Sequence, residues 1–196
     1  MRYRGRVLYL ASQSPQRAML LSRAGIPFTV VNSIGDEETV RGLPPIALAI
    51  ARARIKAEGA VVSKSHAGDV VLGADTVVAL GDDVFGKPRD DADGRRILRR
   101  LQGTSHQVIT GHHLIRLADG VCRSAHAVVE VTMRQVEDRE IEAYLATGEH
   151  RGRAGAYAIQ ETADRFVIAL NGPWDAVVGL HVASVEVALL ELRVAN

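Results

Sequence analysis

One carboxylate stands inside an otherwise apolar stretch of the chain. Asp75 interrupts the run from Val70 to Leu80, whose other residues are apolar, small or β-branched. Such a run is typical of a strand that is buried on both faces of a sheet. A carboxylate there costs desolvation energy unless a cation, hydrogen-bond donors or a cleft compensates. Two interpretations stay open on this evidence: Asp75 is a functional acid, or it caps a turn after Gly73.

A second candidate for chemistry is the segment Ser12-Gln13-Ser14-Pro15-Gln16-Arg17, which follows an expected strand at residues 7–11. Ser14 suits the N-cap of a helix and Pro15 its first position. Free backbone N–H groups at such a helix start can bind an anion. Arg17 opposes the helix dipole, so an anion between the two would resolve the conflict. The alternative is that Arg17 points to solvent.

Two lysines and an acidic loop could join these groups. Lys56 lies in an Ala-rich helix expected at residues 46–62, and Lys87 stands between a glycine and a proline. Lys87 could reach a phosphate, although an ordinary surface lysine explains its position equally well. Most lysines on a helix such as that of Lys56 are solvated, and Lys56 alone would not be singled out. The acidic loop Asp36-Glu37-Glu38 could join a metal site only if oxygen ligands converge from elsewhere, and Asp75 is one candidate.

The elements that must position these groups alternate early in the chain. Beyond those already given, we expect strands at 26–31, 84–88, 106–117, 121–133 and 166–170, and helices at 91–101, 136–147 and 182–194. Asp119-Gly120 marks a hairpin turn. The fold class is therefore α/β, with a mixed twisted sheet flanked by helices. A ligand cleft is expected where the early loops meet.

Composition narrows the function classes. The 196 residues are 47% apolar and 24% charged, which predicts one domain or two closely joined lobes. A net charge of +1 gives no reason to expect nucleic acid or an anionic membrane as partner. The single Cys122 suits a reducing compartment, and we see no signal-peptide core or membrane span. We expect a cytoplasmic protein. Adjacent His112 and His113 would face opposite ways on a strand, so a zinc site is not expected.

A set of short motifs, taken in order, resembles the Maf family of nucleoside triphosphate pyrophosphatases. Each motif alone is common, whereas the ordered set is specific and runs from about Val7 to Leu180. The motifs are Ser12–Arg17, Asp36-Glu37, Lys56-Ala57, Gly73-Ala74-Asp75-Thr76, Gly86-Lys87-Pro88, Ser105–Gly111, Ala154–Gln160 and Val177–Leu180.

The resemblance implies a single Maf-like domain over residues 1–196, with an inosine triphosphatase-like fold of two lobes around a nucleotide-binding cleft. It implies hydrolysis of nucleoside triphosphates to the monophosphate and pyrophosphate. Asp75 would activate water, and Glu37 with Asp75 would hold a divalent metal, Mg or Mn. The residues implied to bind the triphosphate are Ser12, Ser14, Arg17, Lys56 and Lys87. A homodimer is also implied.

The family divides by base preference, and the segment Tyr157–Gln160 resembles the branch that acts on dTTP, UTP and modified pyrimidine nucleotides. The positions implied to select the base are Gln16, Thr76 and Gln160. Gln16 replaces an arginine that is usual in that branch, and His181 stands where a proline is usual. A different function class remains open: a non-catalytic nucleotide-binding regulator of septum formation. Such a binder would have no need for Glu37 and Asp75 together.

Overall fold

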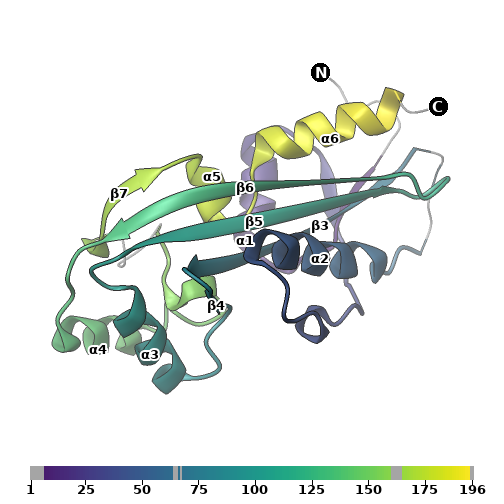
Figure 1. The fold of residues 1–196 in the computed structure, drawn as a ribbon. Coiled ribbons are helices and arrows are strands. Elements are labelled where there is room, and N and C mark those ends of the chain that lie inside the picture. The colour runs from purple at the N-terminus through teal and green to yellow at the C-terminus, as the bar shows by residue number, and fades with distance from the viewer. Residues whose placement is uncertain (1–6, 64–65, 67, 160–164, 195–196) are drawn as a thin grey trace. The chain divides into compact units, whose positions relative to one another are not determined.

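The computed structural model describes residues 7–63, 66, 68–159 and 165–194 (Figure 1). The strands are β1 Leu8–Leu10, β2 Phe28–Val30, β3 Val70–Leu80, β4 Asp83–Phe85, β5 Ser105–Arg116, β6 Cys122–Met133 and β7 Val167–Asn171. The α-helices are α1 Pro15–Arg23, α2 Pro45–Glu58, α3 Asp91–Leu101, α4 Asp138–Thr147, α5 Trp174–Val178 and α6 Val182–Val194. Two short 3₁₀ helices are η1 Glu37–Thr39 and η2 Ala154–Ala156.

Within these residues the strands form one mixed sheet in the order β2-β1-β3-β5-β6-β7, with β4 paired to β3. Strand β1, next to the edge strand β2, runs parallel to both β2 and β3, with Tyr9 opposite Thr29 on one side and Val71 on the other. The strand pairs β3–β4 and β6–β7 are antiparallel. The expected α/β class, a mixed sheet flanked by helices, is confirmed.

The chain divides into two compact units. Unit 1 comprises Met1–Asp75, Thr110–Ala127 and Gly179–Asn196, and unit 2 comprises Thr76–Ile109 and Val128–Val178. Each unit has its own apolar core. Fully buried side chains in unit 1 include Leu8, Leu10, Leu21, Leu72 and Leu114, and those in unit 2 include Val77, Leu101, Ile109, Val129 and Tyr144.

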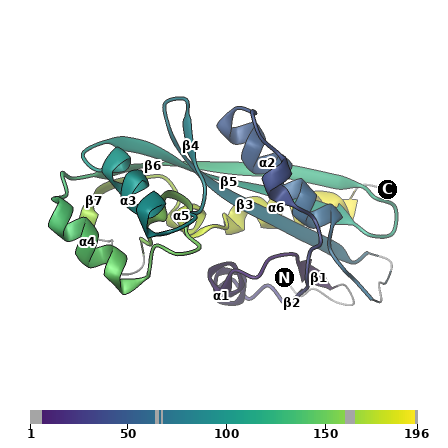
Figure 2. The ribbon, with the colours of Figure 1, turned by 90° about the horizontal axis from the view of Figure 1, so that it is seen from below.

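In unit 1, α2 packs against β3 and β5, as Figures 1 and 2 both show. The closing helix α6, yellow in Figure 1, lies beside the β5–β6 hairpin, where Arg123 pairs with Glu191 at 3.1 Å. In unit 2, α3 and α4 lie side by side. An edge-to-face contact between Tyr144 and Phe166, with ring centroids 5.5 Å apart, joins α4 to the residue before β7.

Element boundaries differ from the sequence-based expectation at a few places. Helix α2 ends at Glu58 rather than at residue 62, because Gly59 follows it and Ala60 already pairs with Ser33 in an isolated bridge. The cap of α3 is Asp90, whose side chain accepts a hydrogen bond from the Asp93 N–H at 2.7 Å. The pattern did not predict α5, η1 or η2.

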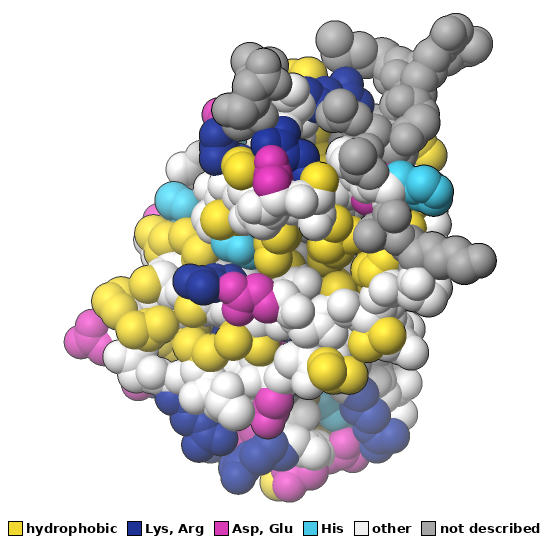
Figure 3. Space-filling view, turned by 90° about the vertical axis from the view of Figure 1, so that its right-hand side faces the viewer, with side chains coloured by type: hydrophobic (Ala, Val, Ile, Leu, Met, Phe, Trp, Pro, Cys, Tyr) yellow, Lys and Arg dark blue, Asp and Glu magenta, His cyan; other side chains and the backbone are white. Residues whose placement is uncertain are grey.

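Charges are balanced locally. On the face drawn in Figure 3, Lys and Arg side chains lie next to Asp and Glu side chains. No helix formed by the described residues combines the length and the apolar character needed to cross a membrane.

Candidate active site

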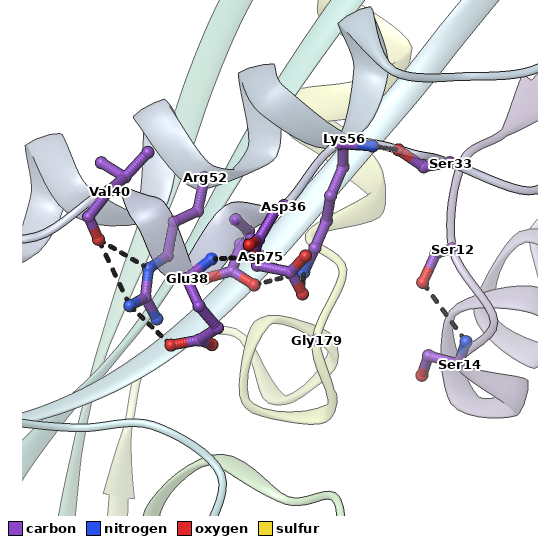
Figure 4. A network of polar contacts seen from close by, with 12 residues as sticks. Ser12, Ser14, Ser33, Asp36, Glu38, Val40, Arg52, Lys56, Asp75 and Gly179 are labelled. Atoms are coloured by element: carbon purple, nitrogen blue, oxygen red, sulfur yellow. Dashed lines mark hydrogen bonds and ion pairs between the residues drawn. The ribbon is translucent and has the colours of Figure 1, made fainter.

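The site in unit 1 is centred on a buried ion pair between β3 and α2. Asp75 is only 6% exposed and lies inside β3, so the interpretation of this residue as a turn cap is wrong. Lys56 Nζ donates to Asp75 Oδ1 at 2.6 Å and lies 3.0 Å from Glu37 Oε1 (Figure 4). One ammonium group is therefore shared by two carboxylates that stand 38 residues apart in the sequence.

Glycines in the sheet allow α2 to bring Lys56 to this position. A Cβ atom on Gly73 would lie 2.1 Å from the carbonyl oxygen of Ala53, and one on Gly111 would lie 2.5 Å from the carbonyl carbon of Ala49. Only a residue without a side chain permits such a close approach of helix backbone to sheet. Gly73 and Asp75 share one face of β3 because side chains alternate along a strand. The helix that fills the space over Gly73 therefore presents Lys56 to Asp75.

A second pair of glycines holds the acidic loop against the end of α2. A Cβ on Gly35 would lie 2.2 Å from the carbonyl oxygen of Ile55, and one on Gly59 would lie 2.4 Å from the Gly35 nitrogen. The Ile34 N–H donates to the Gly59 carbonyl at 2.9 Å. These close backbone contacts explain why Glu37 reaches Lys56, which the sequence of the acidic loop alone does not predict.

The three consecutive carboxylates have three different roles. Asp36 caps η1, since its Oδ1 accepts from the Glu38 N–H at 3.1 Å. Glu37 is partly buried and contacts Lys56. The exposed Glu38 pairs with Arg52 at 3.2 Å (Figure 4). Asp36 and Glu38 are thus occupied locally, and Glu37 is the one that faces the buried pair.

The serine loop and Arg17 form the other side of the site. Ser12 Oγ accepts from the Ser14 N–H at 3.3 Å and from Arg17 Nη1 at 2.9 Å, while Arg17 Nε donates to the Gly179 carbonyl at 2.9 Å. Arg17 is 9% exposed, so the alternative that it points to solvent is wrong. Burial lowers the pKa of the Arg17 guanidinium, and the charges of Asp75 and Glu37 oppose that shift.

The start of α1 keeps the polar character expected of an anion site. Ser14 occupies the N-cap and Pro15 the first helical turn, as predicted, but Ser14 makes no side-chain cap. Its hydroxyl instead donates to Gln16 Oε1 at 3.1 Å. The N-terminal end of α1 therefore offers backbone N–H groups, to which an anion could bind.

One oxygen of the central acid is left without a partner. Among the described residues, none makes a hydrogen bond to the buried Asp75 Oδ2. A buried carboxylate oxygen without a donor fits a hard divalent cation, and the Glu37 carboxylate is chemically suited to the same ion. The described residues contain no group of three or more His, Cys, Asp or Glu side chains suited to a metal. Oxygen atoms of a ligand or water would have to complete the coordination of an ion at Asp75 and Glu37.

Of the remaining predicted residues, two belong to unit 2 and one lies outside the described residues. Thr76 follows Asp75 in β3 and is partly buried, whereas Lys87 is exposed in the loop after β4, in unit 2. Gln160 lies outside the described residues. Sequence reasoning gave no role to Gly179, whose carbonyl holds Arg17. Its only signal was membership of the motif Val177–Leu180, because a backbone acceptor leaves no trace in residue type.

Comparison with known proteins decides the family. A family model described as "Maf-like protein" matches residues 7–192. The chain belongs to the Maf family. It is 43% identical over 184 residues to a protein of Anaeromyxobacter dehalogenans named dTTP/UTP pyrophosphatase, with 93% of this chain and 92% of that protein covered.

Two further relatives carry the same name. The protein from Alcanivorax borkumensis is 41% identical over 187 residues, covering 94% of each chain. That from Moorella thermoacetica is 42% identical over 179 residues, covering 91% of each. The segments that build the site, Ser12–Arg17, Glu37, Lys56 and Gly73–Asp75, lie within the part that matches the Maf model.

Proposed function

We propose that this Maf-family chain hydrolyses nucleoside triphosphates at the bond between the α- and β-phosphates, releasing a monophosphate and pyrophosphate, as part of house-cleaning of the nucleotide pool. The observation that carries the proposal is the buried Asp75, which shares Lys56 with Glu37 and has one oxygen to which none of the described residues donates a hydrogen bond. The names of the relatives, dTTP/UTP pyrophosphatase, support the same reaction.

In this reaction Asp75 is the general base. Its carboxylate would accept a proton from water, the water oxygen would form a bond to phosphorus, and the bridging P–O bond would break, with release of the monophosphate and pyrophosphate. A positioned base contributes roughly 10²–10⁴ in rate. Asp75 needs no covalent intermediate for this role, and Lys56 keeps the Oδ1 atom of Asp75 in place.

The cations and the start of α1 would take up charge on the phosphates. We assign triphosphate binding to Ser12, Ser14, Arg17, Lys56 and Lys87. Backbone N–H groups and guanidinium donors stabilise oxyanions best where water is excluded, and Arg17 is buried. A regulator that only binds a nucleotide is not favoured, because it would not need two acids around one lysine.

A divalent cation, Mg or Mn, would be held by Glu37 and Asp75. When bound, it would neutralise negative charge on the phosphate oxygens. Removing divalent cations with EDTA should abolish turnover, and adding back Mg or Mn should restore it. Full activity in EDTA would remove the metal from the proposal.

Base preference is the finer part of the proposal. We assign it to Gln16, Thr76 and Gln160, with dTTP, UTP and modified pyrimidine nucleotides as preferred substrates. The relatives' names support the two unmodified substrates. A cytoplasmic location, a homodimer, and the absence of nucleic-acid or membrane partners also remain proposals.

A panel of canonical and modified nucleoside triphosphates tests the function. Phosphate release coupled to an added pyrophosphatase should depend on that pyrophosphatase, because the primary product is pyrophosphate. The monophosphate should appear in equal amount. Tight binding without turnover of any triphosphate would favour the regulator instead.

The substitution Gln16→Arg tests base preference. Arginine adds a charge and two parallel donors at the position where the pyrimidine branch carries one. We expect kcat/KM for UTP relative to a purine triphosphate to rise by about tenfold, the scale of one charge-assisted hydrogen bond. An equal gain for every nucleotide would mean that position 16 senses phosphate alone.

A further inference from the structure

The segment before α6 is held at both ends by side chains of unit 1. At one end, the Gly179 carbonyl accepts from Arg17 Nε at 2.9 Å. At the other, the His181 backbone N–H donates to His112 Nε2 at 3.0 Å. Leu180 between them is completely buried. The three-residue segment Gly179–His181 thus connects a β5 histidine to the guanidinium in the proposed site.

The His112 side chain acts as a hydrogen-bond acceptor. Because Nε2 receives an N–H, that nitrogen must be unprotonated, so the imidazole is neutral. Burial, and to a lesser extent the charge of Arg17, lowers the pKa of His112 to about 3. The ring is completely buried and is absent from the proposed chemistry. Its Nε2 atom accepts from the backbone N–H of His181.

The segment Gly179–His181 contains a flexible glycine, so a second contact is needed to hold its backbone in place. Gly179 has a φ of +117°, in a region that only glycine adopts readily. Glycine also gives the backbone freedom to rotate, which would carry the carbonyl away from Arg17. The hydrogen bond at His181 removes that freedom two residues further on.

We propose that His112 is a positioning residue for Arg17, acting through the His181 N–H and the Gly179 carbonyl to fix the guanidinium beside Asp75 and Glu37. The proposal that this orientation serves catalysis rests on the proposed function. The mechanical link from His112 to Arg17 does not, and it can be measured without turnover.

Hydrogen exchange of the Arg17 Nε–H, followed by NMR, measures that link. The signal is assigned by its disappearance in Arg17→Lys. We expect the buried, hydrogen-bonded proton to be protected in the native chain and to exchange about tenfold faster in His112→Leu, which removes the acceptor. His112→Gln, which retains an acceptor, should restore much of the protection. Unchanged protection in folded His112→Leu would overturn the proposal.

Position 181 provides a second, independent test. His181→Pro removes the N–H, whereas His181→Ala removes the side chain and keeps the N–H. Protection of the Arg17 Nε–H should fall in the proline variant and persist in the alanine variant. Equal loss in both would show that the His181 side chain, rather than its backbone donor, holds the segment, and would overturn the proposal.

A double-mutant cycle connects the link to catalysis. We expect His112→Leu to lower kcat/KM by about tenfold in the native chain, and by less than about twofold when Arg17 is already alanine. His113→Leu is the matched control, because His113 is also buried in β5 but pairs with Ser124. It should leave kcat/KM unchanged. Equal losses with and without Arg17 would mean that His112 only supports the fold.

The two measurements separate the two proposals. If the native chain hydrolyses no nucleoside triphosphate, the proposed function fails, and the exchange data still decide whether His112 positions Arg17. If hydrolysis occurs but exchange at Arg17 is insensitive to His112, only the positioning proposal fails.

Discussion

Two sets of ion pairs in this chain join cations to carboxylates in different environments, one buried and one largely exposed to solvent. In unit 1, Lys56 serves Asp75 and Glu37, and the side chains of Lys56 and Asp75 are less than one-tenth exposed. In unit 2, α4 carries pairs of Arg95 with Glu142, Arg99 with Asp138 and Arg134 with Glu140. The Arg99–Asp138 pair is more than half exposed. We call this second set the α4 ion pairs.

The difference lies in how the partners match. Each α4 ion pair joins one guanidinium to one carboxylate through two parallel donors, and Arg99 reaches both oxygens of Asp138 at 2.8 Å. Hydrogen bonding by these arginines lowers the pKa of Asp138 and Glu142. In the buried set, one ammonium is shared by two acids, and one oxygen of Asp75 receives no hydrogen bond from the part of the chain that the structure describes. In an exposed ion pair, water can hydrogen-bond to any polar atom that lacks a protein partner. In a buried set water is excluded, so a carboxylate oxygen without a hydrogen bond is costly and indicates a ligand site.

The largest expected effect is the loss of catalysis when the buried acid Asp75 is replaced. Asp75→Asn keeps the shape of the side chain but removes the base, so kcat should fall by roughly 10²–10⁴ with the fold intact. The matched change Asp138→Asn, on α4, should leave kcat unaltered. Steady-state kinetics and circular dichroism on both variants check this. Near-normal turnover of folded Asp75→Asn would exclude it as the base.

Removing the shared cation should affect stability most. Lys56→Met removes the ammonium that Asp75 and Glu37 share, and breaking a buried pair in this way costs about 3 kcal/mol. The two negative charges then repel each other, so the deficit should be smaller at low pH than at neutral pH. Urea unfolding at several pH values measures it.

The control for this change is Arg54→Met, which removes an exposed cation two residues earlier on α2 that pairs with Glu58. It should change the unfolding free energy little at any pH. If both variants lost the same stability with the same pH dependence, burial of Lys56 would not matter.

For the substitution Arg17→Ala, the sequence and the structure predict opposite changes in stability. From the helix dipole alone, Arg17→Ala should leave stability unchanged or raise it by about 0.3–1 kcal/mol. In the structure its side chain donates to the Gly179 carbonyl and to Ser12, so the substitution should lower stability by about 1 kcal/mol or more and weaken triphosphate binding. Arg23→Ala, in the exposed last turn of α1, is the control. A rise in Tm for Arg17→Ala would support the dipole argument.

The smallest effect concerns acid stability of the α4 ion pairs. Hydrogen bonds from Arg134 and from the Glu137 N–H lower the pKa of Glu140 from 4.5 to about 2. Because this pKa is depressed in the folded state, its contribution is present above about pH 4.5 and is lost as the pH falls through about 2. Glu140→Gln should therefore flatten the fall of Tm in that window. An identical pH profile for variant and native chain would contradict this.

Local features of the sequence determined much of the fold. Alternation of apolar strands with helical periodicity predicted the mixed α/β sheet, and Pro15 after Ser14 located the start of α1. The stretch around Asp75 was recognisable because a lone acid in a buried strand is expensive. Short elements such as α5 and η1 were not predicted, since a few residues carry too little periodicity to identify a helix.

The meeting of the candidate residues was decided only by the tertiary structure. Nothing in the spacing of Glu37, Lys56 and Asp75 says that one ammonium contacts both acids. That contact depends on how closely α2 approaches β3 and the acidic loop, which is set by space left open at Gly73 and Gly35. The acceptor for Arg17 is a backbone carbonyl 162 residues away, and every residue type has one. A sequence can reveal which groups are costly to bury, whereas their partners depend on long-range packing.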